Sequence, residues 1–259
     1  MQQKLISISI VNFNSPVSQL LSAIITVMEA INLLQISHPG EGSTIVLVDN
    51  SESNAITLDT FSSLKAGLDG CNCELKLVQG QGNVGYGQGQ NLAFKVNDSH
   101  YHLFINPDVI MEPGCLVAGI AYLEDNEDVA IVSPYATDAM GRKQYLCKLY
   151  PTVMDFFLRG FMPQPIRVLF DRRLSRYEMQ GLSETAPTKS IPIVSGCFML
   201  CRSRIIEQVS GFDPRYFLYF EDFDLSLRVG AISSIAYLPS IRIIHTGGYS
   251  SRKGVLHIG

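Results

Sequence analysis

Two acidic segments of the chain contain side chains that could take part in a reaction. In the first, Asn106-Pro107-Asp108, an apolar run ends at a proline, which cannot continue a central strand, so the chain must turn there. A carboxylate at such a turn can bind a hard cation such as Mg²⁺ or Mn²⁺. A lone aspartate in a turn is also structurally common, so these residues alone leave both roles open.

The second acidic segment, Phe217 to Asp224, places Glu221, Asp222 and Asp224 among aromatic residues at the predicted start of a helix. Apolar surroundings and neighbouring like charges both raise the pKa of a carboxyl group, which prepares it to act as a general base. Acidic residues at a helix N-terminus also offset the helix dipole, and Asp224 could simply form a salt bridge with Arg228. The segment therefore fits a catalytic and a structural role equally well.

A glycine-rich segment without charged residues precedes both of these candidate sites in the sequence. Gly80 to Gly85 matches the pattern G-x-G-x-x-G between a predicted strand and a predicted helix, and the glycines continue at Gly87 and Gly89. Such a loop lets the backbone approach a nucleotide or diphosphate closely. A dinucleotide-binding oxidoreductase is the competing interpretation, although its fingerprint usually opens the domain and two strand-helix units precede this one. No Gly-Lys-Ser/Thr triplet follows, which excludes a P-loop.

One histidine also has a suggestive position. His245 follows an apolar run and precedes the turn Thr246-Gly247-Gly248. It could be a metal or phosphate ligand, or a structural histidine with its hydrogen bonds satisfied.

The elements that must position these residues alternate between strands and helices. Strands are predicted at Lys4–Asn12, Thr44–Asp49, Glu74–Gln79, His102–Asn106 and Val129–Ser133, and helices at Leu20–Leu34, Ile56–Leu68, Asn91–Asn97 and Pro113–Asn126. This order indicates an α/β protein with a mostly parallel central sheet and helices on both faces. Ligands of such sheets bind beyond the carboxyl ends of the strands, where Asn12, Asp49 and Asn106 fall.

After about Pro134 the alternation stops, and residues 135–190 are predicted to be an insertion whose Asp171–Ser190 part is loop-like. Ile191–Cys201 then reads as a buried strand or strand pair, in which Gly196 marks a close backbone approach, and helices follow at Ser203–Val209 and Asp222–Val229. The apolar Leu20–Leu34 run contains polar interruptions and a helical repeat, which predict a core helix rather than a membrane span.

Composition excludes some functions. The net charge of -4 and the pI of about 5.7 provide no general attraction for nucleic acid or anionic lipid. No signal peptide precedes the six cysteines, which are expected to be reduced, structural thiols of an intracellular protein.

In six segments the chain resembles glycosyltransferase family 2, and within it the bacterial rhamnosyltransferases that build lipopolysaccharide O-antigen. The segments are VNFN, VDNSES, GNVGYGQGQN, FINPDVIM, SGCFMLCR and GFDPRYFLYFEDFDLSLR, and they span nearly the whole chain. The resemblance implies a single GT-A domain over residues 1–259, with a nucleotide-sugar-binding half (1–134), the insertion (135–190) and an acceptor and catalytic half (191–259).

Residue roles are carried over by position from the family's motifs. Asp222 matches the catalytic base, and Asp108 stands where the family's D-x-D metal motif ends. Because Asn106 replaces the first acid of that motif, Mg²⁺ or Mn²⁺ would either bind more weakly or depend on a further ligand such as His245. The donor site implied by the resemblance contains Asn12, Asn14, Asp49, Asn83, Gly85, Gly87, Asn91, Asn106 and Arg228.

The implied chemistry is an inverting transfer. Asp222 would deprotonate the acceptor hydroxyl as it attacks the anomeric carbon, while the metal held by Asp108 stabilises the departing nucleoside diphosphate. The resemblance implies dTDP-L-rhamnose as donor, a lipid-linked saccharide as acceptor, and a cytoplasmic location at the inner membrane. A non-catalytic saccharide-binding protein and an NAD(P)-binding oxidoreductase are the alternatives.

The Phe- and Arg-rich Met154–Arg173 segment is a candidate surface for peripheral membrane contact or acceptor docking. An ordinary subdomain core with snorkelling arginines is the other interpretation.

Overall fold

The computed structural model describes residues 4–52, 56–96, 98–163 and 169–247. Within these ranges, ten strands form the central sheet: β1 (Lys4–Asn12), β2 (Ser43–Asp49), β3 (Cys73–Val78), β4 (Ser99–Ile105), β5 (Val109–Met111), β6 (Val129–Thr137), β7 (Lys143–Gln144), β9 (Thr188–Lys189), β11 (Phe198–Arg202) and β12 (Ser234–His245). The strand order is β3-β2-β1-β4-β11-β6-β12-β5, with β7 paired to β6 and β9 paired to β12.

The two halves of the sheet differ in strand direction. Strands β3, β2, β1 and β4 are all parallel, whereas β11 enters between β4 and β6 and runs antiparallel to both. The pairing returns to parallel between β6 and β12 and is antiparallel again between β12 and β5. The sheet is therefore mixed but largely parallel, which confirms the predicted class.

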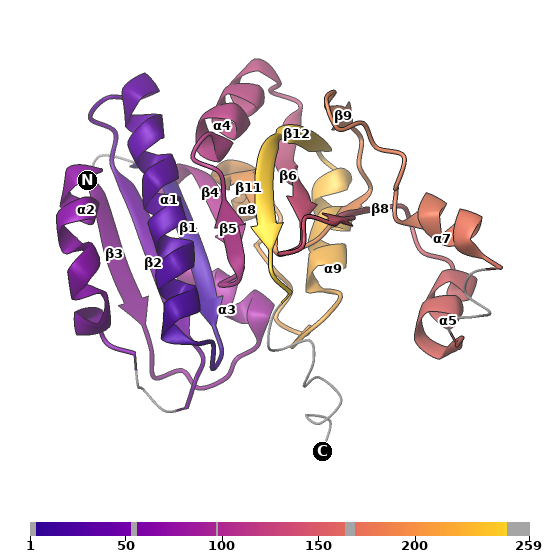
Figure 1. Ribbon diagram of the computed structural model, residues 1–259, viewed down its shortest axis with the longest axis horizontal. Helices are drawn as coiled ribbons and strands as arrows, with labels where there is room; N and C mark the ends of the chain where they lie inside the picture. Colours follow the sequence, from indigo (N-terminus) through magenta and orange to yellow (C-terminus); the bar gives the residue numbers. More distant parts are fainter. Residues whose placement is uncertain (1–3, 53–55, 97, 164–168, 248–259) are drawn as a thin grey trace.

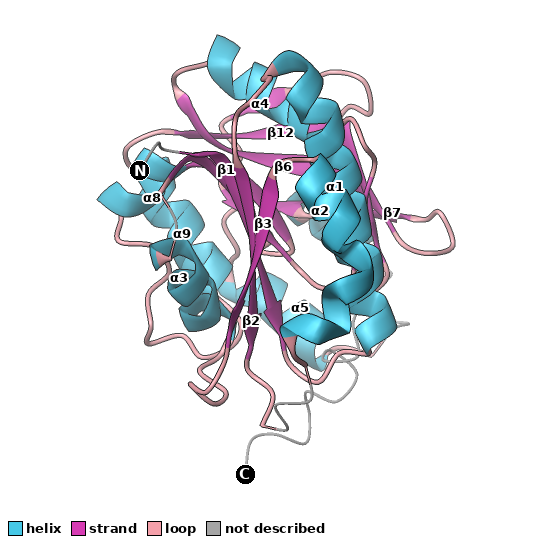
Figure 2. Ribbon diagram, turned by 90° about the vertical axis from the view of Figure 1, so that its left-hand side faces the viewer, coloured by secondary structure: helices cyan, strands magenta, loops and turns pink. Residues whose placement is uncertain are grey.

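Helices cover both faces of the sheet, as Figure 2 shows. One face carries α1 (Val17–Ser37), the 3-10 helix η1 (Leu58–Leu64), α2 (Lys65–Gly70) and α4 (Cys115–Asp125). The other carries α3 (Tyr86–Lys95), α8 (Ser203–Gln208) and α9 (Glu221–Gly230). Because both faces are covered, every residue of β2 is buried, in agreement with its continuous apolar sequence.

Helix α1 is the only described helix that is long and apolar enough to cross a membrane. Its buried side chains recur at helical spacing, from Leu20 and Ile24 through Val27 and Ile31 to Leu34, and belong to the main core cluster. The predicted core helix is confirmed.

The segment after β6 forms a smaller unit at one end of the molecule. It contains β8 (Cys147–Lys148), which pairs with β10 (Ile193–Val194), and the helices α5 (Val153–Phe161) and α7 (Asp171–Tyr177). Figure 1 shows α5 and α7 beside each other, away from the central sheet. The prediction that Asp171–Ser190 is loop-like was wrong for α7, where Leu174 and Tyr177 are buried, and for β9, which joins the sheet. It holds for residues 178–187, which form no helix or strand.

Two further elements differ from the prediction. Helix α3 begins at Tyr86 rather than Asn91, so Gly87 and Gly89 lie inside a helix instead of a loop. A Cβ atom on Gly89 would lie 3.0 Å from the Val11 side chain, so the missing side chain lets α3 pack closely on β1. Strand β12 is the second difference: no strand is predicted there, but the apolar run before His245 belongs to a strand of twelve residues. All six cysteines are buried and free, as expected.

Candidate active site

Asp108 lies on the turn between β4 and β5, where the sheet brings it close to the end of β12. Its side chain is buried, and among the described residues its Oδ1 atom has no hydrogen-bond partner. Its carbonyl oxygen accepts hydrogen bonds from the backbone N–H and the hydroxyl of Thr246, both at 3.1 Å. The backbone is therefore held firmly, while one carboxylate oxygen has no partner in the described part of the chain.

His245 is the last residue of β12 and lies opposite Val109 of β5. Gln144 Nε2 donates to the His245 carbonyl at 2.8 Å, which directs the Gln144 amide oxygen towards His245 Nδ1, also at 2.8 Å. Since that oxygen can only accept, Nδ1 carries the proton, and Nε2 faces Asp108 Oδ2 at 3.4 Å.

The Asp108–His245 pair fits a divalent cation. A carboxylate oxygen and an imidazole lone pair repel each other unless a proton or a cation is shared between them, and Gln144 orients the ring as partners of metal-bound histidines do. No group of three or more His, Cys, Asp or Glu side chains suited to a metal occurs in the described ranges. The pair would supply two ligands, and phosphate oxygens or water the others.

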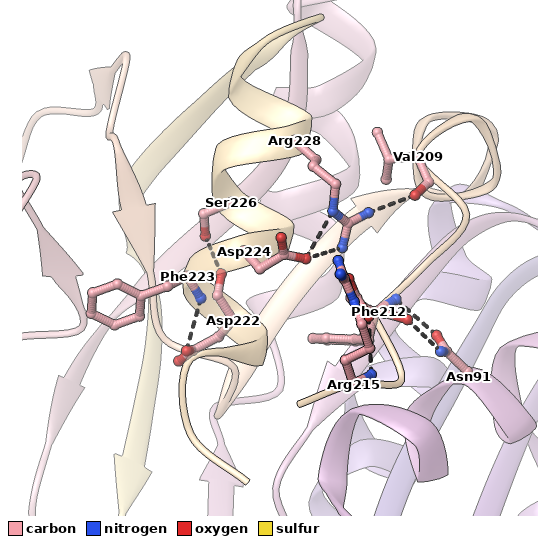
Figure 3. A network of polar contacts seen from close by, with 10 residues as sticks. Asn91, Val209, Phe212, Arg215, Asp222, Phe223, Asp224, Ser226 and Arg228 are labelled. Carbon is pink, nitrogen blue, oxygen red and sulfur yellow. Dashed lines mark hydrogen bonds and ion pairs between the residues drawn. The ribbon is translucent and has the colours of Figure 1, made fainter. Parts of the chain in front are cut away.

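Asp222 lies in the first turn of α9, on a different side of the helix from Asp224 (Figure 3). Its Oδ2 accepts from the backbone N–H of Gly196 at 3.0 Å, and its Oδ1 accepts from the N–H of Phe223 at 2.9 Å. Burial raises the pKa of Asp222, whereas the two N–H groups and the positive charge of Lys148 lower it. The result is a firmly held carboxylate with an increased affinity for a proton, as a general base requires.

The loop Ser195-Gly196-Cys197 connects the two acidic residues. The Cys197 carbonyl accepts a hydrogen bond at 2.9 Å from the N–H of Asn106, which lies two residues before Asp108. The Gly196 N–H donates to the Asp222 carboxylate. Burial, together with the negative charges of Asp108 and Asp222, raises the pKa of Cys197 to about 12. The structure thus brings the predicted base and the predicted metal ligands to the same loop, although 114 residues separate Asp108 from Asp222 in sequence.

Asn12 and Asp49 end the neighbouring strands β1 and β2 and are hydrogen-bonded to each other. Asn12 Nδ2 donates to Asp49 Oδ1 at 2.8 Å, and the second carboxylate oxygen of Asp49 accepts from Gln79 at 3.2 Å. In the adjacent loop, Ser51 Oγ accepts from the Asn14 N–H at 2.8 Å. Asn12 and Asp49 are almost fully buried, and Asn14 is exposed. These bonds shape the loops at the carboxyl edge of the sheet, where the nucleotide pocket was predicted.

The glycine-rich loop packs against the segment that precedes Asp222. Gly85 has a φ of +84°, and a Cβ atom there would lie 2.2 Å from the Phe217 carbonyl oxygen. A Cβ on Gly87 would lie 3.3 Å from Glu221 Cβ. Asn83, the preceding polar residue, is exposed and its side chain accepts from the Gly85 N–H at 3.2 Å.

Arg228 and Asn91, both predicted donor contacts, have their polar groups engaged elsewhere (Figure 3). The Arg228 guanidinium binds Asp224 Oδ2 at 2.8 and 2.5 Å and the Val209 carbonyl at 2.5 Å. The Asn91 side chain binds the backbone of Phe212. The structure does not bring Arg228 to the loop that holds Asp222, and its contact with a diphosphate remains a prediction.

Sequence reasoning missed two residues near Asp222, Lys148 and Tyr86, and gave the named Glu221 no separate role. Lys148 of β8 supplies the positive charge that acts on Asp222 and Cys197. Tyr86 donates its hydroxyl to the Gly196 carbonyl at 2.5 Å. Glu221 is buried beside Asp222, and burial raises its pKa to about 7. The charge next to Asp222 was a visible signal for Glu221, whereas nothing in the sequence around Lys148 indicates its position.

The sequence matches the model of the family "Glycosyl transferase family 2" over residues 7–210. This range covers most of the chain, so the protein belongs to glycosyltransferase family 2 and is a glycosyltransferase. The family match includes Asn12, Asp49 and Asp108 and ends before Asp222. It also decides against the dinucleotide-binding oxidoreductase, in agreement with the position of Gly80–Gly85 after β3, which lies at the edge of the sheet.

Within the family, the chain is similar to rhamnosyltransferases. It is 29% identical to rhamnosyltransferase WbbL of Escherichia coli strain K12 over 225 residues, which are 81% of this chain and 75% of WbbL. It is 26% identical to the N-acetylglucosaminyl-diphospho-decaprenol L-rhamnosyltransferase of Mycobacterium tuberculosis over 195 residues, or 69% of this chain and 61% of that protein. The chain therefore spans less than two thirds of the mycobacterial relative.

Solved structures confirm the GT-A fold. GalNAc-T7, crystallised with UDP, GalNAc and Mn²⁺, superposes with a TM-score of 0.66 at 14% identity, over 94% of this chain and 43% of its own. TarS of S. aureus superposes with a TM-score of 0.61 at 15% identity, over 97% of this chain and 38% of its own.

Proposed function

We propose that this protein transfers L-rhamnose from dTDP-L-rhamnose to a hydroxyl group of a lipid-linked saccharide, with inversion at the anomeric carbon, in synthesis of an O-antigen-type cell-surface polysaccharide. The observation that carries the proposal is the position of Asp222, a half-buried carboxylate joined to the Asp108–His245 pair through one short loop. The names of the two relatives support rhamnose, and the mycobacterial name supports a lipid-linked acceptor.

In this reaction Asp222 accepts the proton of the acceptor hydroxyl while that oxygen forms a bond to the anomeric carbon. The bond between the anomeric carbon and the diphosphate oxygen breaks, and the nucleoside diphosphate leaves with the electron pair. The Gly196 and Phe223 N–H groups hold the Asp222 carboxylate in one orientation, and Lys148 favours its ionised form before the reaction.

The donor would bind in the half formed by residues 1–134, beyond the carboxyl ends of β1, β2 and β4. There Asp49, fixed by Asn12, would read the nucleobase, and Asp108 with His245 would hold Mg²⁺ or Mn²⁺. When bound, such a cation would neutralise charge on the departing diphosphate. The presence of Mn²⁺ and UDP in the GalNAc-T7 structure supports this part of the proposal.

The acceptor would approach through the catalytic half (191–259) and the insertion (135–190). In the insertion, α5 and the two residues that precede α7 expose large apolar side chains: Val153, Met154, Phe157, Leu169 and Phe170. We infer that this surface makes peripheral contact with the cytoplasmic face of the inner membrane, which would bring a lipid-linked acceptor to the protein. The double variant Val153→Ser/Phe157→Ser should then sediment less with phospholipid vesicles than the wild type, and equal sedimentation would count against the surface.

The decisive experiment measures release of dTDP from dTDP-L-rhamnose with Mn²⁺ and a synthetic lipid-linked saccharide. Wild type should turn over, and Asp222→Asn should lose about 10²–10⁴-fold in kcat while it retains the donor-induced rise in Tm. Asp224→Asn is the matched control, because Asp224 pairs with Arg228 on a different side of α9. Full activity of Asp222→Asn would remove its assignment as base, and donor binding without turnover by the wild type would favour the non-catalytic saccharide-binding alternative.

A further inference from the structure

Tyr86 is the first residue of α3, directly after the glycine-rich loop, yet its hydroxyl reaches the loop that holds Asp222. The hydroxyl donates to the Gly196 carbonyl at 2.5 Å, across 110 residues of sequence. Burial of the ring raises the pKa of Tyr86 well above its usual range, so the phenol remains protonated and serves as a donor.

Gly196 is held between Tyr86 and Asp222. A Cβ atom on Gly196 would lie 3.2 Å from Tyr86 Cε1 and 3.4 Å from Asp222 Cβ, so only a glycine fits there without displacement of a neighbour. The carbonyl of Gly196 accepts from Tyr86, and its N–H donates to Asp222 Oδ2 at 3.0 Å. The two bonds orient the two peptide groups that meet at the Gly196 Cα atom.

The backbone of Tyr86 provides a second connection to the same region. Its N–H donates to the Phe217 carbonyl at 3.2 Å, four residues before α9 begins. Tyr86 therefore contacts both segments that flank Asp222, the loop before β11 and the turn before α9.

We propose that Tyr86 is a positioning residue for the general base: by anchoring the Gly196 peptide it fixes the Asp222 carboxylate in the orientation that accepts the proton. The inference rests on the proposed role of Asp222 and adds a residue of the donor loop to the catalytic arrangement. Through Tyr86, a shift of the glycine-rich loop would change the orientation of the Asp222 carboxylate.

The charged and titratable groups around Asp222 come from every neighbouring element. Lys148 lies on β8, Glu221 on α9, Tyr86 on α3, and Cys197 on the loop before β11. Tyr86→Phe alters none of their charges, because the phenol is neutral. A change in the titration of Asp222 in that variant would therefore report the loss of the Gly196 N–H bond, which lowers the pKa of the carboxylate.

The test compares wild type, Tyr86→Phe and Tyr237→Phe by ¹³C NMR of aspartate carboxyl groups, with Asp222→Asn to assign the resonance. Tyr237 is the control, because its buried hydroxyl has no hydrogen-bond partner within the described ranges. Tyr86→Phe should move the Asp222 midpoint upward by roughly half to one pH unit, whereas Tyr237→Phe should leave it unchanged. Gly196→Ala, which displaces the same peptide, should act in the same direction.

Kinetics with dTDP-L-rhamnose give the second measurement. Tyr86→Phe should lower kcat about three- to tenfold, leave the donor KM nearly unchanged and shift the acidic limb of the pH profile upward. An unchanged Asp222 midpoint in Tyr86→Phe would overturn the inference. Absence of transfer by the wild type would instead reject the proposed function, and the NMR titration would still decide whether Tyr86 positions Asp222.

Discussion

Asn91 and Phe212 are joined by two buried hydrogen bonds, although 121 positions separate them in sequence. Asn91 Nδ2 donates to the Phe212 carbonyl at 2.7 Å, and the Phe212 N–H donates to Asn91 Oδ1 at 2.9 Å (Figure 3). The asparagine side chain thus binds backbone as a neighbouring strand would, and it attaches α3 to the turn that leads to α9.

Replacement of Asn91 should consequently affect stability first. Asn91→Ala leaves a buried N–H and a buried carbonyl of Phe212 without partners, and we expect the free energy of unfolding to fall by about 2–4 kcal/mol in urea titrations. Asn126→Ala is the control, since Asn126 makes a single bond to the Tyr122 carbonyl one helical turn earlier. If Asn91→Ala unfolds at the wild-type midpoint but loses donor affinity, Asn91 contacts the donor rather than supporting the fold.

Two glycines of the donor loop allow backbone strain to be separated from steric clash. Gly80 and Gly85 both have positive φ, but a Cβ on Gly80 meets nothing within 4 Å, whereas one on Gly85 would lie 2.2 Å from the Phe217 carbonyl oxygen. Gly80→Ala should therefore cost only about 1–2 kcal/mol. Gly85→Ala should cost more and also weaken donor binding, as calorimetric titration with dTDP would show. Equal losses in the two variants would mean that the contact with Phe217 is unimportant.

The burial of Glu221 has a pH-dependent consequence. Its folded pKa is raised from 4.5 to about 7, so the folded protein binds this proton more tightly than the unfolded chain. The corresponding stability is present below about pH 4.5 and is lost as the pH rises through about 7, a change on the order of 3 kcal/mol. Glu221→Gln should hence raise Tm relative to wild type more at pH 8 than at pH 5. The exposed Glu207→Gln should show no such difference between the two pH values.

Cation binding at Asp108 and His245 can be measured without turnover. We expect dTDP with Mn²⁺ to raise the Tm of the wild type by several degrees, and dTDP alone to raise it less. Asp108→Asn and His245→Ala should each reduce the additional, Mn²⁺-dependent part. His38→Ala, which removes a histidine beside Glu124 at the end of α1, should retain it. A full Mn²⁺ effect in both site variants would exclude this pair as the ligands.

The sequence predicted the first half of the fold well because local signals agree with the tertiary structure there. β1 has the predicted bounds. The nearly continuous apolar residues of β2 require a strand covered on both faces. The antiparallel insertion of β11 between β4 and β6 has no local signal, because its neighbours are set by contacts more than 60 residues away. Periodicity along the chain indicates an element but not its partner.

The same distinction applies to the active site. Asp222 and Asp108 were found because their motifs are specific, but their connection through Gly196 and Cys197 required the sheet order. Lys148 comes from a two-residue strand, which is too short to leave a periodic pattern. Tyr86 lies in a glycine-rich segment, and the glycine pattern gives no indication of a role for its side chain.

The position of β11 also has a consequence during protein synthesis. β1, β2, β3 and β4 are complete once residue 105 has been made, but β4 has no partner on its second edge until residues 198–202 emerge from the ribosome. That edge carries Leu103, Phe104 and Ile105, an apolar strand of the type that associates with other chains when it is unpaired. A nascent chain of this enzyme therefore passes through a long interval in which it is prone to self-association. That interval ends once β11 pairs with β4, before Asp222 has been made.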